Sequence, residues 1–235
     1  MKKFTYLLLA SAMVVGAMSS CAKTNKRKMS NSWSVDERNW SVTNVDSDGD
    51  RFTTEINASG STVTRIETYQ ESGQPSNTTT NTGQLHNAEY TIEKDGTWSS
   101  EFEFTFVDEG DAGMFEYETT SKTKVVTTGE WDMLNGVGDD FKKNERVKFS
   151  VLTETTTTNS TTVTTNTTDN STETTQSTDT ETVQYNAGEN SEIFVVVESG
   201  RKELELESEK EARYTQNGET DVRMETTSLK MTEKE

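Results

Sequence analysis

Glu101-Phe102-Glu103-Phe104-Thr105-Phe106 alternates polar residues with phenylalanine. Because successive side chains of a β-strand point to opposite faces, this stretch places three phenylalanines on one face of a strand. The same two-residue period returns in Phe115-Glu116-Tyr117-Glu118 and Val147-Lys148-Phe149-Ser150-Val151, and near positions 131–133, 204–206, 222–224 and 229–231. No segment after residue 31 keeps a 3.6-residue period. The sequence therefore predicts an all-β domain over residues 32–235.

Turn dipeptides separate these runs. Asp95-Gly96 lies between two alternating runs and is a strong hairpin signal. Five more glycine turns follow the same logic: Asp48-Gly49, Ser72-Gly73, Asn135-Gly136, Ser199-Gly200 and Asn217-Gly218. Short alternating strands joined by turns predict an antiparallel up-and-down meander, closed or half-closed into a barrel.

Residues 151–182 form a low-complexity segment in which 17 of the 32 residues are threonine. Such a segment buries too little apolar surface to fold as an independent unit, yet threonine favours strands. We expect a long polar hairpin that turns near residues 166–170 and protrudes from the barrel. A disordered loop is the alternative.

The composition excludes several functions. The chain has 235 residues, a formal charge of −18, one cysteine and one histidine. The negative charge disfavours nucleic-acid binding. A single Cys and a single His exclude thiolate clusters and two-histidine metal sites. The sequence has no phosphate loop and no Gly-x-Gly-x-x-Gly motif, and no cofactor is expected. His86 is expected to be a solvated loop residue. The three acids at positions 46, 48 and 50 are expected to form a hairpin turn, and we predict no metal site.

Residues 1–20 have the form of a secretory signal peptide. Lys2 and Lys3 precede a mostly apolar run that ends in Met18-Ser19-Ser20 before Cys21, the only cysteine. Met18-Ser19-Ser20-Cys21 resembles the lipobox of bacterial lipoproteins, in which the cysteine is acylated. An uncleaved anchor and plain secretion are the alternatives. On the lipoprotein hypothesis, residues 21–31 form a lipidated basic tether, and the mature chain carries a formal charge of −20 because cleavage removes two lysines and no acids.

Several segments between residues 88 and 235 follow a common order of strand and turn motifs: Ile92-Glu93-Lys94-Asp95-Gly96-Thr97-Trp98, Thr128-Gly129-Glu130-Trp131-Asp132-Met133-Leu134, Lys142-Lys143-Asn144-Glu145-Arg146-Val147, Ile193–Glu198 with Lys202-Glu203-Leu204-Glu205-Leu206-Glu207, and Thr227-Ser228-Leu229-Lys230-Met231-Thr232. In this order they resemble the lipocalin-like lipoproteins of Bacteroidota. The resemblance implies a lipocalin-like barrel on the outer membrane and no established catalytic residues. The basic residues after Cys21 favour the periplasmic side.

The barrel interior is the candidate ligand site. Seven aromatic residues are expected to share it: Trp98, Phe102, Phe104, Phe106, Phe115, Tyr117 and Trp131. They either fill a core or line an apolar pocket. The sequence thus leaves two non-enzymatic functions open: binding of a small apolar or amphipathic molecule, and contact with an envelope protein through the acidic threonine-rich surface. A glycan hydrolase with two carboxylates is a third, weaker hypothesis.

Overall fold

The computed structural model describes residues 26–134, 145–216 and 219–234, and strands account for almost all of them. The strands are β1 (Ser32–Val45), β2 (Arg51–Ser59), β3 (Thr62–Gln70), β4 (Asn77–Ile92), β5 (Thr97–Asp111), β6 (Phe115–Leu134), β7 (Glu145–Asn166), β8 (Thr172–Gln184), β9 (Asn190–Ser199), β10 (Glu203–Gln216) and β11 (Glu219–Glu233). Every pairing is antiparallel. The predicted all-β meander is confirmed.

The sheet closes on itself at one end. β6 pairs with β7 as well as β5, and the start of β1 pairs with the end of β4 through Ser32–Ser34 and Glu89–Thr91. These contacts complete a ring of β1, β4, β5, β6, β7, β9, β10 and β11. The fold is therefore barrel-like, as the turn spacing predicted.

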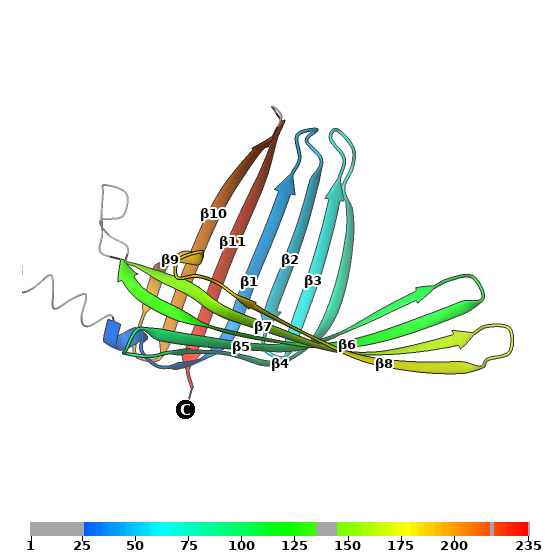
Figure 1. Ribbon diagram of the computed structural model, residues 1–235, viewed down its shortest axis with the longest axis horizontal. Helices are drawn as coiled ribbons and strands as arrows, with labels where there is room; N and C mark the ends of the chain where they lie inside the picture. Colours follow the sequence, from blue (N-terminus) through cyan, green and yellow to red (C-terminus); the bar gives the residue numbers. More distant parts are fainter. Residues whose placement is uncertain (1–25, 135–144, 217–218, 235) are drawn as a thin grey trace, which may run out of the picture.

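Two sheets diverge from the mouth of this barrel (Figure 1). The first, which we call the fan (residues 38–84, 207–216 and 219–228), consists of β2 and β3 with adjoining parts of β1, β4, β10 and β11. The second, which we call the blade (residues 104–124 and 152–184), consists of the far parts of β5, β6 and β7 together with β8. The predicted threonine-rich hairpin is confirmed as β7–β8, with its turn at residues 167–171. The β5–β6 hairpin lies beside it, and this neighbour was not predicted.

Most of the core lies in the closed barrel, where the inward-facing side chains of opposite strands pack against one another, and Ala58 and Val63 extend it into the fan. Trp33, Ile92, Val147, Leu206 and Leu229 are among its fully buried side chains. Rings of Trp98, Phe149 and Phe194 pack edge to face, with centroids 5.1 and 5.8 Å apart. Such aromatic pairs add to the stabilisation that comes from buried area alone.

One helical turn, Lys26–Met29, closes the end of the barrel away from the two sheets. Met29 is fully buried, and its carbonyl accepts a hydrogen bond from Trp33 Nε1 at 2.9 Å. Lys26 Nζ lies 5.1 Å from the Trp131 ring centroid, and Lys28 Nζ donates to the Ser199 carbonyl. The end of the predicted basic tether, including Lys26, Lys28 and Met29, therefore packs against the barrel. Cys21 and the leader lie outside the described residues.

A polar cluster joins the fan to the blade where they separate. Arg65 Nη2 lies 3.0 Å from Asp108 Oδ1, and its guanidinium lies 5.1 Å from the Phe106 ring centroid. Asn81 Nδ2 donates to Asp108 and to the Val107 carbonyl. Gly83 permits the close approach of β4 to β5, because a Cβ there would lie 2.2 Å from the Thr105 carbonyl oxygen.

The predicted turns are observed where the structure describes them. Gly49, Gly73 and Gly96 have φ values of +86°, +77° and +99°, which side-chain-bearing residues rarely adopt. Asp95 Oδ1 accepts from the Thr97 amide in the predicted hairpin. The glycine turns at 135–136 and 217–218 lie outside the described residues.

Candidate functional site in the barrel and the blade

The structure separates the seven aromatic residues into two groups. Trp98, Phe102 and Trp131 are buried in the barrel, Phe106 is buried at the base of the blade, and Phe104 packs partly buried against this core. Phe115 and Tyr117 are 42% and 41% exposed near the tip of the blade. Their expected place in the interior is wrong, because β6 runs far beyond the closed part of the barrel.

The barrel interior is largely filled. A cavity of about 70 Å³ remains, lined by Tyr90, Trp98, Phe149, Val151, Asn190, Glu192, Phe194 and Leu229. The rings of Tyr90 and Trp98 stack with centroids 5.9 Å apart. Typical small-molecule sites have roughly 300–1,000 Å³. The aromatic residues inside the barrel therefore act mainly as a core, and the cavity has room only for a small chemical group of a ligand.

Polar residues at the mouth of the barrel were missed from the sequence. Burial raises the pKa of the Glu192 carboxyl, while the Ser208 hydroxyl and the Arg38 guanidinium favour its charged form. Burial likewise raises the pKa of Tyr90. Arg38 lies over the Phe102 ring at 4.7 Å from the centroid. The alternation Glu192, Phe194, Val196 along β9 is the signal that could have identified Glu192 as inward-facing.

The blade is polar on both faces. Hydroxyl pairs cross its strands on one face at Thr119–Thr162, Ser121–Ser160 and Thr123–Thr158, with oxygen separations of 3.0 to 3.2 Å. Thr155–Thr182 and Thr157–Thr180 pair in the same way on the other face. Hydroxyl pairs between opposite residues stabilise a sheet without an apolar core. Phe106, at the base, is the one buried hydrophobic residue of the blade, all of which the structure describes.

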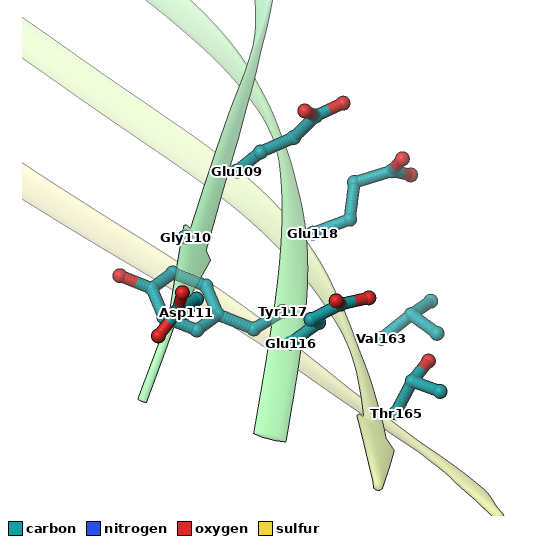
Figure 2. Close-up of a pocket in the computed structure, with 8 residues that line it drawn as sticks. All are labelled: Glu109, Gly110, Asp111, Glu116, Tyr117, Glu118, Val163 and Thr165. Atoms are coloured by element: carbon teal, nitrogen blue, oxygen red, sulfur yellow. The ribbon is translucent and has the colours of Figure 1, made fainter. Parts of the chain in front are cut away.

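The tip of the blade carries an open acidic hollow of about 540 Å³. Figure 2 shows Glu109, Glu116 and Glu118 reaching over one side of β5 and β6, beside Val163 and Thr165 of β7. The Tyr117 ring lies across Gly110, where a Cβ would meet its hydroxyl oxygen at 2.2 Å. The hollow is wide and exposed, so it offers a surface rather than an enclosed site.

The blade is strongly acidic. Its residues include ten carboxylates and two lysines. Both lysines form ion pairs: Lys122 Nζ lies 2.7 Å from Glu103 Oε1, and Lys124 Nζ lies 2.8 Å from Glu101 Oε2. The hydrogen bond from Lys124 lowers the pKa of Glu101. Little positive charge on this sheet is therefore available to a partner.

Two further sequence expectations have a structural outcome. Asp46 Oδ1 accepts from the Asp48 and Asp50 amides, so the acidic stretch forms the expected turn. His86 is exposed, but it lies in β4 at a register shift and not in a loop, and its Nε2 lies 2.8 Å from Thr105 Oγ1. Among residues 26–134, 145–216 and 219–234, no group of three or more His, Cys, Asp or Glu side chains is placed to hold a metal ion.

Comparisons with known proteins add no assignment. No family model, curated protein or solved structure matches the chain. Within the described part of the chain, no helix is long and apolar enough to cross a membrane.

Proposed function

We propose that this chain is a non-enzymatic lipoprotein of the outer membrane, anchored through Cys21, whose blade contacts a protein of the cell envelope. The proposal takes up the resemblance to lipocalin-like lipoproteins for the barrel and the anchor. It assigns the contact itself to the threonine-rich sheet. The barrel serves as the support from which that sheet projects.

The observation that carries the proposal is the blade itself. The barrel ring closes without it, and the blade buries a single hydrophobic side chain. Ordering each backbone residue costs about 1–2 kcal/mol, so a long sheet with so little core is expensive to keep. We infer that the blade is kept for its exposed acidic surface, which a partner can contact.

Crosslinking in the native host tests this function. A photoreactive residue at Thr174, exposed on β8, should crosslink one defined envelope polypeptide, whereas one at Thr215 near the tip of the fan should not. A shortened variant, with residues 109–118 and 155–182 each replaced by Asn-Gly, lacks position 174 and is therefore tested by co-purification. It should keep its barrel but no longer co-purify from the envelope fraction with the polypeptide that crosslinks to Thr174 in the full-length chain. Two-residue Asn-Gly loops suit antiparallel strand pairs such as Asp108–Thr119 and Glu154–Val183. A partner retained by the shortened variant would refute the proposal.

The interior cavity supports a second candidate function, the binding of a small amphipathic molecule. Its rings of Tyr90, Trp98, Phe149 and Phe194 surround one carboxyl, that of Glu192. A ligand whose small polar group enters this cavity should quench Trp98 fluorescence with saturation at one molecule per chain. Absence of saturable quenching by a series of alkyl amines and alkyl alcohols would remove this candidate.

A further inference from the structure

We propose that the free edge of β8 accepts an extended strand from the partner, with lysine or arginine at alternate positions. This inference rests on the proposed function and names the mode of contact and the chemistry of the partner. β8 is the last strand of the sheet, and it pairs only with β7. An unpaired edge presents alternate backbone N–H and C=O groups that can pair with another chain.

The edge of β8 lacks the usual protection. Its 13 residues contain no Pro, Lys or Arg, and its register with β7 runs from Thr165–Thr172 to Thr153–Gln184 without a shift. Natural edge strands are commonly short, bulged, or marked by lysine or proline. The free edge of β10, beyond its pairing with β9, carries Lys210 and Arg213 and so does have charged protection.

Charge selects the occupant. Glu173, Asp179 and Glu181 all lie at odd positions of β8 and therefore on one face of the strand, whereas the even positions carry threonine and glutamine. A neighbouring strand with basic residues at alternate positions would place them opposite these carboxylates, a favourable cross-strand arrangement. A second copy of this chain would instead bring three more carboxylates to the same face. The occupant is therefore a basic, extended segment of another protein.

A synthetic 13-residue peptide of alternating threonine and lysine is the probe, and the protein is the lipid-free chain from residue 22. We expect saturable binding in low salt, with amide exchange slowed at about every second residue of β8. Two control peptides separate pairing from charge: one has the same composition with its lysines in a block, and one is N-methylated at alternate residues. Both should bind at least about tenfold more weakly. Equal binding of all three peptides would overturn the proposal, because it would show attraction by charge alone.

Variants locate the site. The triple variant E173Q/D179N/E181Q should weaken binding of the alternating peptide by about tenfold, in line with three lost cross-strand charge pairs. The matched variant E207Q/E209Q/E211Q, which removes three acids from β10, should bind normally. The reverse order of effects, or a protein that is already dimeric with its β8 amides protected, would also overturn the proposal. A blade-dependent crosslink in cells without peptide binding would leave the proposed function standing and refute the edge pairing alone.

Discussion

Replacement of Gly129 by alanine should destabilise the barrel far more than the same change at Gly110. A Cβ at Gly129 would lie 1.9 Å from the Ser150 carbonyl oxygen and 2.7 Å from Trp98 Nε1. That indole donates to the same Ser150 carbonyl at 3.3 Å, in the buried interior. Overpacking costs about 1–3 kcal/mol and a lost buried hydrogen bond about 1 kcal/mol, so Gly129→Ala should cost about 2–4 kcal/mol.

Gly110→Ala is the matched control. A Cβ there would also approach within 3 Å of other atoms, but those atoms belong to the Tyr117 ring, which is 41% exposed and can swing away. Its cost should stay within about 0.5 kcal/mol. Urea unfolding followed by tryptophan fluorescence measures both variants; with a slope near 3 kcal/mol per molar urea, the Gly129 variant should lose about 1 M in midpoint. Equal midpoints for the two variants would refute the assignment of Gly129 to a close strand contact.

Three further predictions test other parts of the molecule. Met29→Ala should lower the free energy of unfolding in urea by about 2–4 kcal/mol, because it leaves a cavity where Met29 is buried at the closed end of the barrel. Met114→Ala, at a 62% exposed site, should change it little. Glu192→Gln should raise the free energy of unfolding at pH 7. Because burial raises the pKa of Glu192, the wild-type protein loses stability as the pH rises through the folded pKa. The advantage of the variant should therefore vanish when unfolding is measured below the unfolded pKa near 4.5. Cys21→Ser should move the protein from the membrane to the soluble fraction, and mass analysis of the wild-type N-terminus should find acyl chains; an unmodified thiol in the native host would contradict the anchor.

The alternation of polar and apolar residues predicted strands in the regions of β5, β6, β7, β10 and β11. Phe102, Phe104 and Phe106 do share one face, and the threonine-rich hairpin does project. The same pattern failed for Phe115 and Tyr117 because alternation reports which face a residue occupies and not how far along a strand the core extends. Phe115 and Tyr117 lie on the same face of the blade as the buried Phe106. At their position along β6 the fan has already diverged from the blade, so no opposing sheet covers them.

Other features depend on contacts that a local pattern does not contain. The burial of Met29 follows from a helical turn that meets the ends of several strands, and a single helical turn has no periodicity to detect. The closure of β1 on β4 and of β6 on β7 involves pairings between residues far apart in the chain. The candidate edge at β8 was equally hidden, because the sequence predicts a strand and not the number of its neighbours.

On the proposed anchoring through Cys21, the docking of Lys26–Met29 against the barrel would limit how far the molecule can rise from a bilayer. Five peptide bonds separate Cys21 from Lys26, a reach of at most about 18 Å even when fully stretched. Acyl chains on that cysteine would hold the end of the barrel that Lys26–Met29 closes near the lipid headgroups. The open end, with the fan and the blade, would then point away from the membrane. Search for a partner would then proceed by diffusion in two dimensions at nearly fixed height, so a binding site of modest affinity could still be occupied for much of the time.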